Sequence, residues 1–339
     1  MKNKRAVVLW LWCGVVMIFV QIVLGGITRL TGSGLSITKW EIVTGTIPPL
    51  NAKEWNEAFD LYKHTPQFQK INTGITLDEF KFIYFWEYLH RLWARSIGFV
   101  FLFPFIFFAA KGWLTKKLYT DLGIAVLLGA LVAAFGWIMV ASGLIERPWV
   151  SGYKLTIHLN LALLLFSWLL WVAIGDQERI YSQDLKKITN VLTMVIIVQF
   201  LLGGLMSGMK AGLYYPTWPD MHGEFFPKIL IDKDIWTYDR VIHYERGPIP
   251  GIVQFLHRMT AYGILLITAI LYWKSKKKPF SNTIIKPVGI MLLLVIAQVV
   301  LGIFTVINCL GKIPLVLGVI HQITAILILS NLVYLQRKL

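Results

Sequence analysis

Residues 21–40 read QIVLGGITRLTGSGLSITKW, and residues 199–218 read QFLLGGLMSGMKAGLYYPTW. Without a gap, the two stretches place a glutamine, a pair of glycines, a later glycine and a tryptophan at matching positions. A shared bias toward apolar residues would not align glycine and tryptophan in the same order. The sequence therefore predicts two copies of one structural unit, each with this stretch at the end of its first apolar segment.

Two more pairs of motifs continue the match, and each pair aligns two histidines. The paired motifs are EYLHRLWARSI (87–97) with QFLHRMTAYGI (254–264), and TIHLNLA (156–162) with VIHQITA (319–325). We accordingly predict an N-terminal copy over residues 1–176 and a C-terminal copy over residues 177–339. The repeat makes each residue of one copy comparable with its counterpart in the other.

The chain is too apolar for a soluble protein. Of its 339 residues, 56% are hydrophobic and 15% are charged, whereas a soluble protein has about 25% charged residues. Eight apolar segments have the roughly 20 residues needed to cross a bilayer: 7–27, 83–110, 121–142, 152–174, 188–208, 251–273, 283–308 and 314–335. The first lacks a small-residue cleavage site, so we expect a retained helix. The prediction is an all-α polytopic membrane protein of two parallel four-helix bundles.

The net charge of +15 follows membrane topology and does not indicate binding to nucleic acid. The Lys and Arg residues of the N-terminus, of three short loops and of the C-terminus fall on one side of the eight-span arrangement. Short basic loops stay in the cytoplasm, so both termini are predicted to be cytoplasmic. The long loops 28–82 and 209–250 then face outward, and the four aligned histidines lie toward the outer face.

These histidines are His90, His158, His257 and His321, one in each of four spans. Ionisable residues inside a membrane are costly and mark function, and imidazole is a common axial ligand of haem iron. Within each copy the two histidines lie about 9 to 11 Å along their helices, so they can face each other across the bundle. We predict two bis-histidine haem sites. A packing role for each histidine is the alternative, while a zinc site would need more ligands and a proton relay would need more acids.

Glu87 lies one helical turn before His90, and the matching position in the second copy is Gln254. An ion pair with Arg91 would give Glu87 a structural role, but Arg258 occupies the matching position without an acid. The asymmetry indicates that Glu87 is catalytic and that the N-terminal site performs the reaction. Arg91 and Arg258 are predicted either to pair with haem propionates or to extend to the membrane surface.

Cys13 and Cys309 lie near opposite ends of their spans, so we expect no disulfide and no thiol chemistry. In loop 28–82, Trp40 and Trp55 favour an interfacial aromatic belt. A short amphipathic helix over the haem pocket is the alternative for this loop.

Four motifs extend the pattern beyond the histidines: GGITRLTGSGLS (25–36), PPL (48–50), EYLHR (87–91) and GWIMVASGL (136–144). Together with the paired histidines, they resemble the haem A synthase family over nearly the whole chain. The long first outer loop has no cysteine pair, which is similar to the branch found in proteobacteria and mitochondria.

The resemblance implies oxidation of the C8 methyl group of haem O to a formyl group, through a hydroxymethyl intermediate, which gives haem A for cytochrome oxidase. It implies that His90 and His158 hold haem O, that His257 and His321 hold haem b, and that Glu87 is the essential acid. Haem O synthase and cytochrome oxidase assembly are the implied partners, in the lipid bilayer of a bacterial plasma membrane. The alternatives are a dihaem cytochrome b-like electron carrier and a transporter, and homo-oligomerisation stays open.

Overall fold

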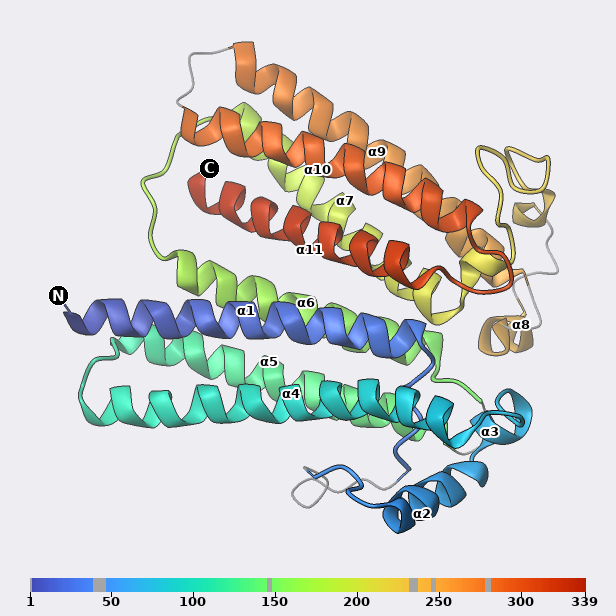
Figure 1. The fold of residues 1–339 in the computed structure, drawn as a ribbon. Coiled ribbons are helices and arrows are strands. Elements are labelled where there is room, and N and C mark those ends of the chain that lie inside the picture. The colour runs from blue at the N-terminus through green and yellow to red at the C-terminus, as the bar shows by residue number, and fades with distance from the viewer. Residues whose placement is uncertain (1, 39–46, 145–147, 232–236, 245–247, 278–281) are drawn as a thin grey trace. The chain divides into compact units, whose positions relative to one another are not determined.

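The computed structural model describes residues 2–38, 47–144, 148–231, 237–244, 248–277 and 282–339. Within these ranges the regular structure is helical, apart from an isolated β-bridge between Met221 and Glu224. Eight of the described helices are long and apolar enough to cross a membrane, which confirms the predicted all-α, multi-pass class. They are α1 (Lys2–Leu30), α4 (Leu77–Ala110), α5 (Lys116–Ala141), α6 (Gly152–Ile174), α7 (Gln183–Gly208), α9 (Ile249–Lys277), α10 (Asn282–Ile307) and α11 (Leu315–Lys338) (Figure 1).

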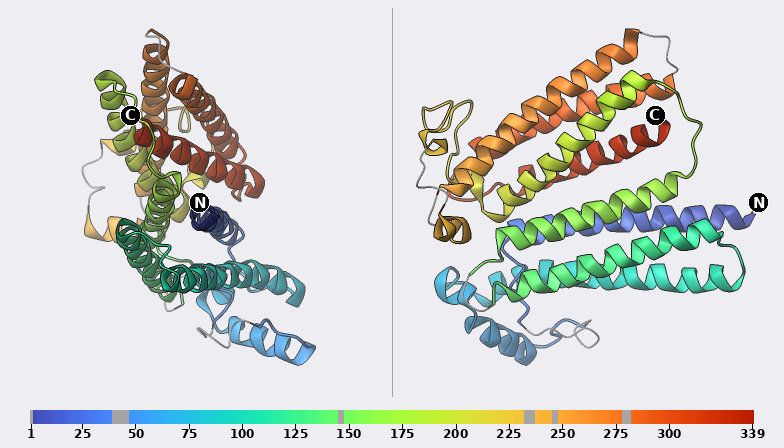
Figure 2. Two further views of the ribbon diagram at one scale, coloured as in Figure 1. Left: turned by 90° about the vertical axis from the view of Figure 1, so that its left-hand side faces the viewer. Right: turned by 180° about the vertical axis from the view of Figure 1, so that it is seen from behind.

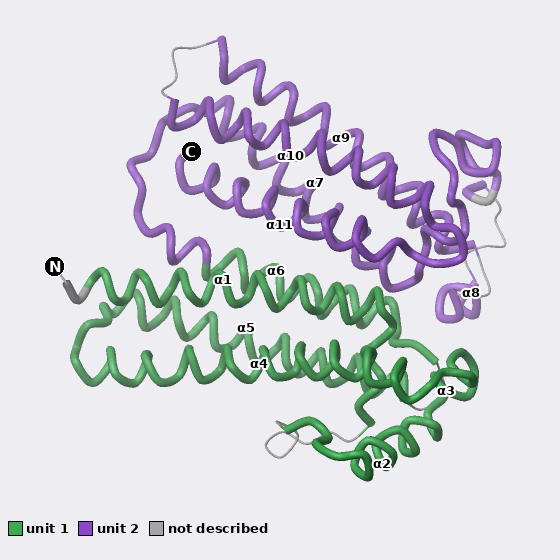
Figure 3. The backbone as a smooth tube through the Cα atoms, in the orientation of Figure 1, with its two compact units in different colours: residues 1–169 green, residues 170–339 purple. Residues whose placement is uncertain are grey.

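The chain divides into two compact units, residues 1–169 and 170–339 (Figure 3). Unit 1 contains α1, α4, α5 and most of α6, and unit 2 contains α7, α9, α10 and α11. Within each unit the long helices run alongside one another (Figure 2). The boundary falls near the C-terminal end of α6, a little before residue 176, and the domain division drawn from the sequence stays a prediction.

Capping residues explain where the helices begin and end. Thr76 starts α4 with a capping box, in which its hydroxyl accepts from the Glu79 N–H and the Glu79 carboxylate accepts from the Thr76 N–H. As a result α4 begins at Leu77, earlier than the apolar segment predicts, and its first turns are polar. Gly112 follows the helix with a φ of +63°, a left-handed conformation that glycine adopts without strain.

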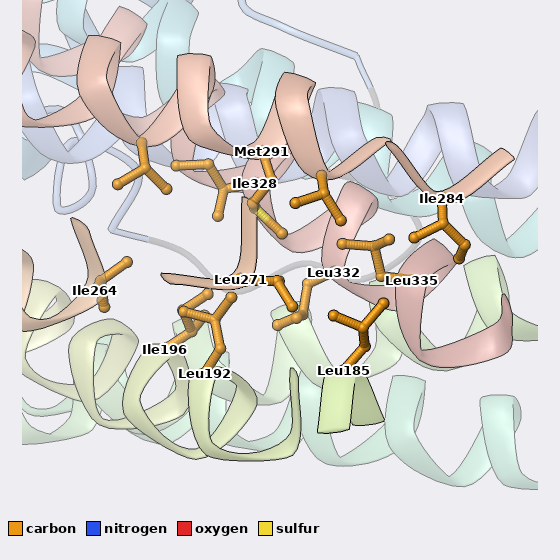
Figure 4. Close-up of a cluster of buried hydrophobic side chains, with 12 residues drawn as sticks. Leu185, Leu192, Ile196, Ile264, Leu271, Ile284, Met291, Ile328, Leu332 and Leu335 are labelled. Carbon is orange, nitrogen blue, oxygen red and sulfur yellow. The ribbon is translucent and has the colours of Figure 1, made fainter. Parts of the chain in front are cut away.

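Unit 2 has a continuous apolar core between its four long helices (Figure 4). Its labelled members are Leu185, Leu192 and Ile196 of α7, Ile264 and Leu271 of α9, Ile284 and Met291 of α10, and Ile328, Leu332 and Leu335 of α11. Because lipid is as apolar as these side chains, such helices associate through close packing and polar contacts. Other helix faces expose large apolar residues, for example Leu266 and Leu293, as expected for faces that contact lipid.

Unit 1 carries a small helical segment between α1 and α4. It contains α2 (Ala52–Lys63) and α3 (Pro66–Lys70), which pack around the buried rings of Tyr62 and Phe80. Trp55 of α2 contacts Phe80 edge to face, so the short helix packs on the start of α4. Trp40 lies outside the described residues.

The corresponding segment of unit 2, between α7 and α9, holds three short elements within its described part. They are the 3-10 helices η2 (Ala211–Leu213) and η3 (Lys228–Leu230) and the helix α8 (Tyr238–Ile242). This segment stands where the sequence predicts loop 209–250.

Candidate functional site

His90 of α4 faces α1 within unit 1. The amide nitrogen of Gln21 donates to the His90 carbonyl oxygen (3.2 Å) and lies 3.0 Å from Nε2 of the ring. Because an amide nitrogen only donates, Nε2 is the acceptor and carries the lone pair. A Cβ at Gly25 would lie 3.1 Å from the same Nε2, so glycine at this position lets α1 approach the imidazole.

His158 of α6 faces α5. Its Nδ1 donates to the carbonyl oxygen of Val132 (2.9 Å), which leaves the lone pair on Nε2. A Cβ at Gly136 would lie 2.9 Å from Cε1 of the ring, closer than real Cβ atoms come. His90 and His158 are close enough for their charges to interact. Unit 1 therefore brings together the two histidines that the sequence predicts as a pair.

Unit 2 contains the counterpart of the first arrangement. Gln199 of α7 donates to the His257 carbonyl oxygen (3.1 Å), and its amide nitrogen lies 3.4 Å from His257 Nε2. A Cβ at Gly203 would lie 3.5 Å from the ring. The sequence alignment pairs Gln199 with Gln21 and Gly203 with Gly25, so the same contact is built from matching positions.

His321 of α11 has a different partner from its counterpart. The amide nitrogen of Gln298 in α10 lies 3.1 Å from His321 Nε2, and a Cβ at Gly302 would lie 3.2 Å from the ring. When Gly136 of α5 is aligned with Gly302 of α10, Val132 occupies the position of Gln298. His257 and His321 are also close enough for their charges to interact, so unit 2 brings together the second predicted pair.

The four imidazoles fit the ligand set of haem iron. Nε2 is the ring nitrogen that would bind iron, and Nε2 of His90, His257 and His321 lies 3.0–3.4 Å from a glutamine amide nitrogen. A glycine stands beside every ring, and Nδ1 of His257 and of His321 is buried without a partner among the described residues. The described part of the chain contains no cluster of three or more His, Cys, Asp or Glu side chains that could hold another metal ion. Two imidazoles from different helices of one unit, each beside a glycine, are a donor set that fits haem iron.

Glu87 of α4 is buried, with 3% of its surface exposed, and both carboxylate oxygens accept hydrogen bonds. Oε2 accepts from the backbone N–H groups of Ser36 (2.8 Å) and Ile37 (2.9 Å) and from the Ser36 hydroxyl (2.7 Å). Oε1 accepts from the guanidinium of Arg91, which also donates to the Ile37 carbonyl oxygen (3.2 Å). The ion pair with Arg91 is therefore one part of a larger network, which fastens the outer segment of unit 1 to α4.

Arg258 of α9 makes a related attachment in unit 2. Its guanidinium donates to the backbone carbonyl oxygens of Tyr215 (3.4 Å), Thr217 and Asp220 (3.0 Å). The Gln254 side chain adds a hydrogen bond to the Tyr215 carbonyl oxygen (2.7 Å). Pairing of Arg91 and Arg258 with haem propionates stays a prediction, and the hydrogen bonds of these arginines attach Arg91 to Ile37 and Arg258 to residues 215–220.

The remaining histidines and the cysteines lie apart from these pairs. His64 follows α2, and His222 and His243 belong to the outer segment of unit 2. Cys13 and Cys309 are free thiols. Burial raises the pKa of the Cys309 thiol above its usual value, so this group is protonated and poorly reactive at neutral pH.

Comparison with known proteins assigns the family. The sequence profile of the family described as cytochrome oxidase assembly protein matches residues 8–333. The chain belongs to this family. The relatives include proteins named Heme A synthase. The one from Flavobacterium psychrophilum is 40% identical over 98% of both chains. Those from Nitrosospira multiformis and Rhizobium rhizogenes are 36% and 38% identical, over 99% and 96% of this chain and over 94% and 88% of their own chains, respectively. The resemblance drawn from the sequence motifs is thus confirmed. No solved structure matches the chain.

Sequence reasoning does not identify several members of this site. The sequence shows Gln21 and Gln199 as an aligned pair but does not show what they contact. A glutamine within an apolar span nevertheless indicates a polar contact, because its amide needs a partner in the membrane. Gln298 gives the same signal without a counterpart in the first copy. Ser36 gives none, since a serine in a loop is unremarkable until its acceptor is known.

Proposed function

We propose that this membrane protein is an oxidoreductase that makes haem A for cytochrome oxidase, by oxidising the C8 methyl group of haem O to a formyl group. The observation that carries the proposal is the presence of two histidines in the long helices of each unit, with a glycine beside every ring. The relatives named Heme A synthase, which match over nearly the whole chain, give independent support.

Unit 1 is the proposed substrate site, with haem O between His90 and His158, and unit 2 is the proposed site of haem b, between His257 and His321. The support for this assignment is the acid beside only one pair, since Glu87 stands one turn from His90. When bound, haem b supplies one-electron transfer. In unit 2 the imidazoles of His257 and His321 would hold that group, and the surrounding helices would shield it from water.

Glu87 is the proposed catalytic residue. Both oxygens of its carboxylate already accept hydrogen bonds, from Ser36, Ile37 and Arg91. We therefore favour a role for its negative charge. The charge stabilises positive charge that develops on the methyl carbon as electrons leave it, in preference to removal of a proton by the carboxylate.

The proposal includes an orientation and partners. Basic short loops support cytoplasmic termini and sites toward the outer face of a bacterial plasma membrane. The matching contacts of Gln21 and Gln199 support the internal repeat. Haem O synthase would supply the substrate, and cytochrome oxidase assembly would take up the product, while a homo-oligomer is compatible with both.

The competing function is a dihaem electron carrier, in which both haems stay bound. In such a carrier, Glu87 and Gln254 would serve only to attach residues 36–37 and Tyr215 to their helices. We would express the protein together with a haem O synthase in a host that makes no haem A, then extract and separate the pigments. A formyl-bearing haem is the expected result, whereas haem O alone, from protein with normal haem content, would overturn the proposal. Glu87→Ala should retain bound haem and form no haem A.

A further inference from the structure

The attachment of residues 33–37 to α4 depends on a carboxylate. Two backbone N–H groups and a hydroxyl, from Ser36 and Ile37, converge on Oε2 of Glu87 at 2.7–2.9 Å. The Arg91 guanidinium bridges Oε1 of the same group and the Ile37 carbonyl oxygen. Hydrogen bonds to an ionised acceptor are about twice as strong as neutral ones. The segment is therefore fastened by an acceptor that serves on both oxygens and carries the charge opposite to Arg91.

The same segment is held on its other side by packing. Leu35 is buried, and a Cβ at Gly143, just beyond the end of α5, would lie 2.8 Å from its side chain. Residues 33–37 thus span from α4 to the end of α5 at the outer end of unit 1. Glu87, to which they are attached, is one helical turn from His90.

Unit 2 fastens its outer segment with the opposite polarity. Gln254 is fully buried and donates to the Tyr215 carbonyl oxygen, and Arg258 donates to carbonyl oxygens of residues 215–220. Here the segment presents acceptors and the helix supplies donors. A neutral amide can donate to these oxygens. A carboxylate at position 254 would place its own oxygen against the Tyr215 carbonyl oxygen, and two acceptors form no hydrogen bond.

We infer that Ser36 and Arg91 are positioning residues, which hold the Glu87 carboxylate in place, and that the attachment of residues 33–37 to α4 requires the negative charge of residue 87. In unit 2, the attachment of residues 215–220 to α9 requires no charge at position 254, which matches position 87. The inference rests on the proposed function in one respect. The unit proposed to exchange its haem has a loop attached to α4 by a charged side chain, whereas the unit proposed to keep its haem has a loop attached to α9 without a charge at position 254.

The test is a reciprocal exchange of the two side chains, followed by backbone hydrogen exchange on the purified full-length protein. Glu87→Gln keeps the size of the side chain. Its amide nitrogen would replace Oε1, so that two donors, this nitrogen and the Arg91 guanidinium, would face each other. We expect the amides of Ser36 and Ile37 to exchange about tenfold faster or more, because their acceptor is neutral and displaced. Peptides covering residues 213–221 should be unchanged.

Gln254→Glu is the matched control and should give the reverse result, with faster exchange in residues 213–221 and unchanged exchange at Ser36 and Ile37. Ser36→Ala removes only the hydroxyl, and the Ile37 amide should then exchange about threefold faster. Unchanged protection at positions 36 and 37 in Glu87→Gln would overturn the inference. Loosening of both units by either exchange would overturn it as well, since that outcome indicates general destabilisation.

A kinetic readout separates positioning from plain stability. In Ser36→Ala, the carboxylate of Glu87 loses one of its fixed donors, so kcat for haem A formation should fall about tenfold while KM for haem O and the haem b content stay the same. An equal loss of haem b would contradict the positioning role. The exchange measurement involves no haem conversion, so it stands or fails separately from the proposed function.

Discussion

Replacing Gly136 with alanine is expected to displace the ring of His158. The new Cβ would stand 2.9 Å from Cε1 and 3.2 Å from Nδ1 of that ring, whereas ordinary contacts begin at 3.4 Å. The imidazole must move by about 0.5 Å to relieve the closest contact. It is not free to do so, because Nδ1 is bonded to the Val132 carbonyl oxygen at 2.9 Å.

The size of the effect follows from two opposing contributions. Overpacking of this kind costs about 1 to 3 kcal/mol, and the higher helix propensity of alanine offsets about 0.5 to 1 kcal/mol of it. The remaining cost, about 0 to 2.5 kcal/mol and about 1.3 kcal/mol at the midpoints, falls on the position of the His158 ring, and about 1.4 kcal/mol corresponds to a tenfold change in a binding constant. We therefore expect Gly136→Ala to weaken haem binding in unit 1 by about tenfold.

The assay is titration of haem-depleted protein with haem, followed by the absorption of low-spin, bis-histidine iron. Gly203→Ala is the matched control, since its Cβ would lie 3.5 Å from the His257 ring, an ordinary contact. We expect this control to bind haem like the unsubstituted protein. The reasoning from Cβ distances is refuted if Gly136→Ala retains full affinity, or if Gly203→Ala loses as much as Gly136→Ala.

Three further predictions concern other parts of the chain. His321→Ala should abolish low-spin haem b absorption, because one axial ligand is lost; a normal haem spectrum from the purified variant would reject the proposed cofactor site. Phe80→Ala removes a fully buried ring between α2 and α4, at a cost of about 3 to 5 kcal/mol, so hydrogen exchange in α2 should rise while the spans stay protected. Equal protection of α2 in both proteins would mean that this ring does not hold it. Burial raises the pKa of the Cys309 thiol, which keeps it protonated at about pH 7 and slow to react with a maleimide until the protein is unfolded; rapid labelling of the native protein would contradict this.

The long helices could be predicted from the sequence because apolar length is a local property. Each span needs about 20 apolar residues, whatever its neighbours are, and all eight predicted segments are helical in the structure. The start of α4 could not be placed in this way, because its first turns are polar and the capping box at Thr76 decides it. The histidine pairs stay a prediction, which rests on the alignment of His90 with His257 and of His158 with His321.

The roles of the polar residues beside the histidines could not be predicted in the same way. Glu87 suggests chemistry from its sequence position, and the structure adds donors from Ser36 and Ile37, about fifty residues earlier in the chain. Arg258 suggests a partner for an anion, and the structure gives it backbone carbonyl oxygens. In both cases the deciding partner is a backbone group, which every residue possesses and no motif distinguishes.

The sequence by itself determined that this is a membrane protein, that eight segments are long and apolar enough to span the bilayer, and which histidines the repeat aligns, since these follow from composition, segment length and alignment. The tertiary structure alone decided the direction of the hydrogen bonds around them. Residues 36–37 present N–H groups to α4, and residues 215–220 present carbonyl oxygens to α9. Which side of a peptide group a loop turns toward a helix depends on how the whole segment is folded back, and this orientation sets whether an acid or an amide is needed beside each histidine pair.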